Sequence, residues 1–194
     1  TDPVTDPVTD PVTEPVVVPE GAIAYFYPAA ITEDLSGIIG DHETVTPITG
    51  SLGIPALGAH VNTNADGVSV SLVEEDGEKF LRYTNEKSYT YSQLYIHLDP
   101  TVFNTKGTYY FSLTFKFNEG FACNDAQGRA LLARLVDTAQ NGYTVITKDA
   151  LLENDYSEWT TVNFAITAPN GAPTVLRLLI YSEEELLHCV AFVL

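Results

Sequence analysis

The chain has 194 residues, with 9 basic and 26 acidic side chains and a formal net charge of −17 at pH 7. A hydrophobic content of 45%, with 9 Phe, 11 Tyr and 1 Trp, is enough for a folded core and excludes a wholly disordered chain. The negative charge repels phosphate backbones and anionic lipids, which excludes nucleic acid as a partner, and it disfavours acidic polysaccharides such as pectin. Apolar runs fall far short of the roughly 18 residues that a membrane span needs.

The first twenty residues form a linker. The tetrapeptide TDPV occurs three times and is followed by TEPV, so Pro recurs every fourth position. Proline removes backbone donors and fixes φ, and the acidic residues repel one another, which together favour an extended polyproline-like spacer. The start at Thr1 and the absence of Met suggest an excised fragment, so a lost leader peptide stays possible. We expect residues 1–20 to be a linker and residues 21–194 to be one domain.

Period-two alternation predicts strands through the domain. In Tyr109 to Phe117 the apolar residues fall on one face and the polar ones on the other, and the same pattern recurs around Val70, Ile96 and Phe164. Glycine-containing turn dipeptides such as Asn141-Gly142 separate these runs. The pattern indicates an all-β, antiparallel β-sandwich of the jelly-roll type. We expect a core that includes Trp159, Phe111, Phe115, Phe164 and Leu178.

The remaining segments of the domain have less regular patterns. Val175 to Tyr181 and Cys189 to Leu194 are apolar on both faces, as sandwich strands can be. Ala130 to Ala139 contains helix formers, but its position between hairpin-like elements favours a strand over a helix. Between residues 29 and 58 the periodicity is weak, and a short helix at Thr32 to Ile39 is the only element we expect there.

Catalytic motifs are absent from the sequence. No G-x-S-x-G or S-x-x-K motif occurs, and neither Cys lies in a cysteine-protease context, so covalent catalysis has no support. Glutamates near turns supply the residue type of a glycosidase pair, but their separation is not given by sequence, and a solvated surface is the simpler interpretation. The histidines lack zinc-ligand spacing, and His97 alternates with Ile96 and Leu98 as a solvated strand residue would.

Two weaker features leave alternatives open. Asn62 to Gly67 has the alternating oxygen ligands and the glycine of a calcium loop, but the bidentate position falls on Val73, so a plain hairpin turn is favoured. We therefore expect no cofactor, with a structural calcium ion as the weaker alternative. Cys123 and Cys189 could form a disulfide in an oxidising compartment or stay as two free thiols.

Tyrosines in polar, turn-adjacent settings are the candidate ligand-binding residues. An aromatic face flanked by carboxylates and amides matches a pyranose, which has an apolar C–H face and a rim of hydroxyls. Burying part of one ring contributes on the order of 1 to 3 kcal/mol. The alternative is that each ring only covers a sheet face. The candidates are Tyr89, Tyr91, Tyr143, Tyr181 and Glu183.

The order of three segments resembles β-sandwich carbohydrate-binding modules of families four, nine and twenty-two. Val68 to Tyr91 is similar to the early strand pair of these modules, Lys106 to Phe117 to a central strand, and Trp159 to Leu194 to the final strands. The resemblance implies that Tyr89 or Tyr91 replaces a loop tryptophan of the family and that Trp159 is structural. It also implies that Tyr143 is a binding aromatic and that Tyr181 and Glu183 form a ring-and-carboxylate pair.

The chain departs from the family at two positions. Glu86 stands where the family has a loop arginine, which puts the family's preference for xylan in doubt. Val190 and Ala191 replace a pair of aspartates, so a structural calcium ion loses a ligand. The expected function is non-catalytic binding of a neutral plant polysaccharide (xylan, β-glucan or starch) by a monomeric, extracellular bacterial module. The alternatives are a spacer domain without a sugar site and a glycoside hydrolase.

Overall fold

The computed structural model describes residues 20–35, 45–61, 68–75, 77–85, 92–117, 131–146, 158–180 and 185–193. Its strands form two six-stranded antiparallel sheets, here called sheet A and sheet B. Sheet A has the order β10-β7-β12-β5-β4, with β1 paired to the end of β12, and sheet B has the order β2-β3-β6-β11-β8-β9. The strands are β1 (Tyr25–Phe26), β2 (Val45–Pro47), β3 (Ala56–Val61), β4 (Val68–Glu75), β5 (Glu78–Asn85), β6 (Ser92–His97), β7 (Gly107–Phe117), β8 (Leu131–Asp137), β9 (Gly142–Ile146), β10 (Thr160–Ala168), β11 (Pro173–Ile180) and β12 (Glu185–Val193).

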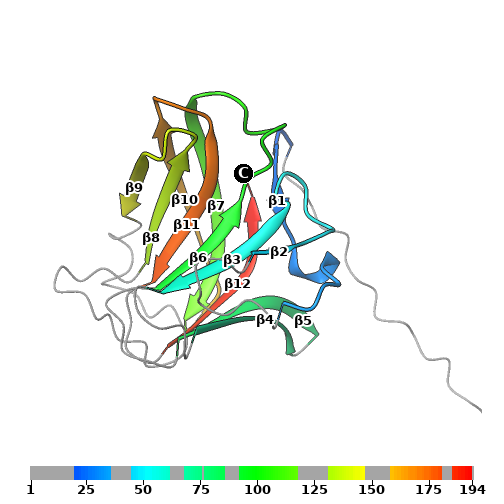
Figure 1. Cartoon of the computed structure of the whole chain (residues 1–194). Coiled ribbons are helices and arrows are strands. Elements are labelled where there is room, and N and C mark those ends of the chain that lie inside the picture. Colours follow the sequence, from blue (N-terminus) through cyan, green and yellow to red (C-terminus); the bar gives the residue numbers. More distant parts are fainter. Residues whose placement is uncertain are drawn as a thin grey trace, which may run out of the picture.

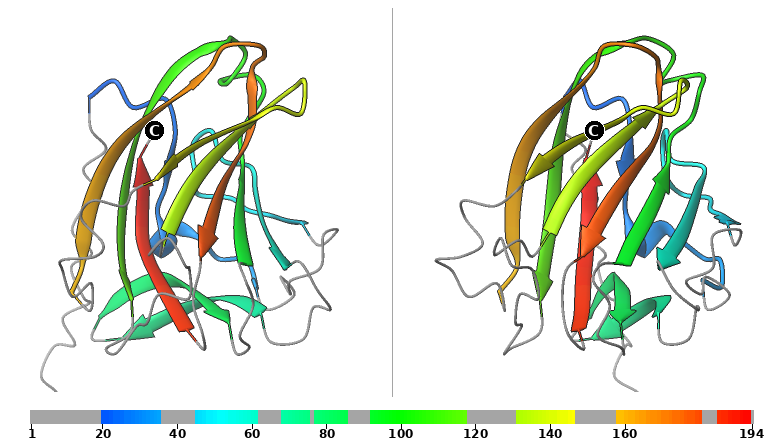
Figure 2. Two further views of the ribbon diagram at one scale, coloured as in Figure 1. Left: turned by 90° about the vertical axis from the view of Figure 1, so that its left-hand side faces the viewer. Right: turned by 60° about the vertical axis from the view of Figure 1, so that its left-hand side comes forward.

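The sheets pack face to face as a β-sandwich, which confirms the predicted fold class. In Figure 1, β8, β11 and β6 lie in front of β10, β7 and β12, and Figure 2 shows the two layers from the side. The hairpin of β4 and β5 crosses the lower end of the molecule in Figure 1. The predicted linker, residues 1–20, lies outside the described residues except for Glu20, so it stays a prediction.

Alternation places the core between the layers. Phe111 and Phe115 of β7 and Leu178 of β11 are buried in the shared cluster, as predicted. Removing such side chains from water stabilises the fold by about 1.5–3 kcal/mol each. The turn dipeptides also behave as expected, since Gly77 joins β4 to β5 with a φ of 82°, which a residue with a Cβ rarely adopts.

Residues 131–137 form a strand, as favoured, and the helical alternative is wrong. β8 pairs with β11 on one side and with β9 on the other. Its alternate residues Leu131, Ala133 and Leu135 are fully buried in the core. Ladder pairing on both edges outweighs the helix propensity of this segment.

The expected helix at Thr32 to Ile39 is wrong for its described part. The chain instead forms a short 3-10 helix, η1 (Pro28–Ala30), and residues 31–35 are not helical. A side chain competes for the backbone here, because Glu33 accepts hydrogen bonds from the amides of Thr32 (3.2 Å) and Thr49 (2.7 Å). The rest of the expected helix lies outside the described residues.

Trp159 and Phe164 are only partly buried, which corrects the expected core. Trp159 lies one residue before β10, so strand alternation places it on the same side as the exposed Thr161 and Asn163. Its ring meets Phe80 edge-on at 5.7 Å, and Nζ of Lys116 lies 5.0 Å from its centroid. Phe164 faces inward and stacks on Phe111 at 5.2 Å, at the margin of the core.

Candidate functional site

The outer side of sheet B carries a row of polar and aromatic residues. Tyr95 of β6 is paired in register with Arg177 of β11, which is paired with Arg134 of β8, and Arg134 is paired with Thr144 of β9. Three inter-strand spacings of about 4.8 Å make this row about 14 Å long. Because the flanking residues of each strand face the core, these side chains point away from it. We call the surface formed by Gln93, Tyr95, His97, Arg134 and Arg177 the Tyr95 face.

Aromatic and cationic groups contact one another on the Tyr95 face. The guanidinium carbon of Arg177 lies 4.7 Å from the centroid of the Tyr95 ring, a cation–π contact. The ring of His97 meets that of Tyr95 edge-on at 6.4 Å. On the other side of Tyr95, the residue paired with it on β3 is Gly58, which offers no side chain. Tyr95 is partly exposed.

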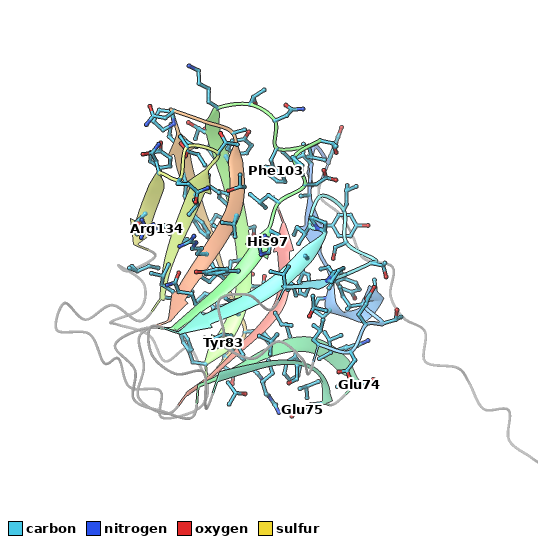
Figure 3. All side chains as sticks on the ribbon, viewed as in Figure 1. Glu74, Glu75, Tyr83, His97, Phe103 and Arg134 are labelled. Atoms are coloured by element: carbon cyan, nitrogen blue, oxygen red, sulfur yellow. The ribbon has the colours of Figure 1, made fainter. Side chains whose placement is uncertain are left out.

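Arg134 lies against the backbone of β9. An added Cβ at Gly142 would overlap the guanidinium group of Arg134, so this glycine leaves the space that the group occupies. Figure 3 shows Arg134 and His97 on the layer nearest the viewer. Aliphatic residues alternate with the polar ones on this side of the strands and are buried. These residues are Leu132, Val136, Val175 and Leu179, each at most 7% exposed.

Three buried polar atoms on the Tyr95 face have no hydrogen-bond partner within the described part of the chain. They are Nε2 of His97 and the Nε atoms of Arg134 and Arg177. Buried polar groups are normally paired, because leaving one unpaired costs about 1–3 kcal/mol. Burial, and to a smaller extent the charge of Arg177, lowers the pKa of His97 below 6.5, so its ring is neutral at pH 7. These three atoms are too deeply buried for a surface ligand to reach, but Arg134 and Arg177 are partly exposed, and each guanidinium has further N–H donors for an oxygen-rich ligand.

A second polar cluster has its hydrogen bonds satisfied internally. The buried Asp137, at the end of β8, accepts bonds from the amides of Ala139 and Asn141, both at 2.9 Å, and from the hydroxyl of Tyr143 at 2.8 Å. Nδ2 of Asn170 donates to the Tyr143 hydroxyl at 2.9 Å. This cluster ties the turn before β9 to the turn before β11, which is a structural task.

Of the predicted site residues, only Tyr143 is described. Its ring packs against the core and its hydroxyl belongs to the Asp137 cluster. Tyr143 pairs with Leu135 of β8. Leu131, at the other end of β8, pairs with Ile180 and lies about 14 Å from Leu135 along the strand.

The other four predicted site residues lie outside the described residues, so the site stays a prediction. Ser92 and Ile180, the described residues next in sequence to two of them, are paired with each other at that far end of sheet B. Tyr143 therefore lies at the opposite end of β8 from the pair formed by Ser92 and Ile180. The four residues are Tyr89, Tyr91, Tyr181 and Glu183.

Sequence reasoning did not find the Tyr95 face. The available signal was the alternation in β6, where Gln93, Tyr95 and His97 point opposite to Leu94 and Ile96. We interpreted His97 as solvated, whereas it is partly buried. The arginines could not be associated with Tyr95 without the strand order.

No group of three or more potential metal ligands occurs among the described residues. Residues 62–67, which resemble a calcium loop, lie outside the described residues. Cys123, which could form a disulfide with Cys189, also lies outside them. Within the same ranges, no helix has the length and apolar character to cross a membrane.

The fold is similar to that of solved carbohydrate-binding modules. The CBM22-1 xylan-binding domain of Paenibacillus barcinonensis Xyn10C is 15% identical, with 84% of this chain and 92% of that chain covered and a TM-score of 0.49. The C-terminal family 22 module of Clostridium thermocellum Xyn10B is 15% identical, with 79% and 94% covered and a TM-score of 0.49. Modules of families 61 and 30 also match.

A domain described as enzymatically active is also among the similar structures. The enzymatically active domain of tailspike protein 4 from bacteriophage CBA120 is 14% identical, with 86% of this chain and 22% of that chain covered and a TM-score of 0.41. No family model and no curated protein sequence matches the chain. Identities of this size carry neither a ligand nor an activity from one protein to another.

Proposed function

We propose that this chain is a non-catalytic polysaccharide-binding module that holds its ligand on the Tyr95 face. The observation that carries the proposal is a partly exposed aromatic ring, Tyr95, in one row with the partly exposed side chains of Arg177 and Arg134. A pyranose presents C–H groups that an aromatic side chain can cover and hydroxyls that can pair with guanidinium, amide and imidazole groups.

The proposed ligand has a neutral backbone, with xylan, β-glucan and starch as the candidates. The formal charge of −17 supports this choice, because it opposes binding of a polymer charged at every residue. We further propose that the module belongs to a secreted or surface-attached bacterial protein and is tethered through residues 1–20. Tethering raises the effective concentration of linked modules at a polysaccharide, so weak binding by each module suffices. Tyr89, Tyr91, Tyr181 and Glu183 are proposed to extend the site.

Affinity electrophoresis against xylan, β-glucan, mannan and starch tests this proposal. We expect retardation by at least one neutral polysaccharide and no release of reducing sugars. Tyr95→Ala should weaken binding by about 1–3 kcal/mol, or about five- to a hundredfold. Tyr110→Ala is the matched control, because Tyr110 is 76% exposed on the outer side of sheet A. Retardation by none of the polysaccharides would favour a spacer domain, and released sugar would favour a hydrolase.

A further inference from the structure

The strands of sheet B are nearly devoid of acidic residues. The whole chain has 26 Asp and Glu residues, but Asp137 is the only one within the six described strands of this sheet. Two of the chain's nine basic residues, Arg134 and Arg177, face outward there. The described strands of sheet B thus present two outward-facing positive charges on a strongly acidic protein.

The positions of Arg134 and Arg177 lower the stability of the folded state. They are directly opposed across β8 and β11, and like charges in this arrangement are destabilising. Each also has a buried Nε atom without a hydrogen-bond partner in the described part of the chain. Asp137 forms no ion pair with them, because alternation along β8 places it on the core-facing side with Leu135 and opposite to Arg134. No contact among the described residues accounts for two such arginines side by side.

Arg82 on sheet A, unlike these two arginines, forms an ion pair with a carboxylate of the described residues. Its Nη2 atom donates to Oε1 of Glu75 at 2.5 Å, an ion pair supplied by the neighbouring strand β4. The described residues give Arg134 and Arg177 no equivalent carboxylate. A guanidinium group forms its strongest hydrogen bonds with carboxylates, frequently through two parallel N–H donors.

We infer that the Tyr95 face recognises a carboxylate of the glycan, and that the ligand is a polysaccharide with isolated uronic acid residues on an otherwise neutral chain. This inference rests on the proposed function and narrows its ligand class. Isolated carboxylates follow from two opposing observations. The local pair of arginines favours an anion, whereas the net charge of −17 repels a polymer with a carboxylate on every sugar.

The contacts on the face keep the two guanidinium groups apart. The guanidinium of Arg177 lies over the Tyr95 ring, and that of Arg134 lies against Gly142. A guanidinium that contacts a ring through its face can still donate hydrogen bonds from its N–H edge to a carboxylate in its plane. A uronic acid carboxylate that binds Arg177 would therefore lie next to the aromatic ring that holds the neutral part of the chain. Arg134 offers a second position farther along the row.

The test compares a xylan bearing glucuronic acid branches with the same polymer after chemical reduction of its carboxyl groups to alcohols. The wild-type domain should bind the carboxylated form about tenfold more tightly, or more. Added salt should remove most of that difference. This comparison needs no variant, so it does not depend on any mutant folding correctly.

Variants then assign the effect to the arginines. Arg177→Gln and Arg134→Gln should each reduce the preference for the carboxylated form, and the double variant should bind both forms equally. Arg82→Gln is the matched control, since it removes the same charge from sheet A and should retain the preference. Thermal unfolding confirms that each variant is folded.

The outcomes separate the two proposals. Equal wild-type binding to both forms, or binding only to other neutral polysaccharides, would overturn the carboxylate inference and leave polysaccharide binding standing. A preference that survives in the double arginine variant would overturn the inference as well. Binding to no polysaccharide of either kind would overturn both.

Discussion

The hydroxyl of Tyr143 donates a hydrogen bond of 2.8 Å to Oδ2 of Asp137, and this bond joins strand β9 to the buried end of β8. Tyr143→Phe removes the donor while keeping the ring. We expect the melting temperature to fall by about 2–8 °C, because a buried carboxylate loses one of its charge-assisted bonds. Tyr109→Phe is the control, since its hydroxyl donates to the exposed carbonyl of Thr105 at 2.6 Å and should matter less. Equal melting temperatures for wild type and Tyr143→Phe would contradict a structural role for this bond.

Asp137 makes the domain sensitive to acid. Burial raises the pKa of this carboxyl, but hydrogen bonds from Asn141, Tyr143 and Ala139 outweigh burial and hold the pKa below 3.8. The unfolded chain therefore takes up the proton first, and the stabilisation is present above about pH 3.8 and lost as the pH falls through the lower folded value. Denaturant unfolding between pH 5 and pH 2 should show a smaller loss of stability for Asp137→Asn than for wild type. Parallel curves for the two proteins would count against this prediction.

His97 should report on Arg177. Burial and the nearby guanidinium charge lower the pKa of His97 below 6.5, so its contribution to stability is complete above about pH 6.5 and is lost as the pH falls through the folded value. In Arg177→Gln the pKa should rise and yet stay below 6.5, because burial remains the larger cause. An NMR titration of the imidazole measures this directly. A pKa that does not change in Arg177→Gln would mean that the two groups do not interact.

Core and outer-face aromatics should differ in their effect on stability. Phe115 is fully buried, so Phe115→Ala should cost about 3–5 kcal/mol. Trp159 is partly exposed and rests on Phe80 and Lys116, so Trp159→Ala should cost only about 1–2 kcal/mol. Urea unfolding of both variants tests the order. If Trp159→Ala lost more unfolding free energy than Phe115→Ala, Trp159 would have to be part of the buried core.

The fold could be predicted from the sequence because its signals are local. Alternation in Tyr109 to Phe117 and the glycine turns act over a few residues, and they specify strands and hairpins without further information. Trp159 was misplaced because one residue decides which side of a strand a side chain takes. The Tyr95 face depends on pairing between residues 95, 134 and 177, which strand order alone brings together. Alternation in the sequence shows that these three side chains point outward, but it does not show that they are neighbours on the sheet.

Gly142 offers a test of the face that leaves its charges intact. A Cβ at this position would overlap the Arg134 guanidinium, and the end of a flexible side chain can move aside at little cost. Gly142→Ala should therefore fold with a free energy of unfolding within about 1 kcal/mol of wild type. Its preference for the carboxylated polysaccharide should fall, because Arg134 is displaced from its position against β9. Gly107→Ala is the control, since nothing lies within 4 Å of a Cβ there. If Gly142→Ala and Gly107→Ala both keep the full preference, Arg134 does not contact the carboxylate from the position that Gly142 allows, and Arg177 alone would be left to bind it.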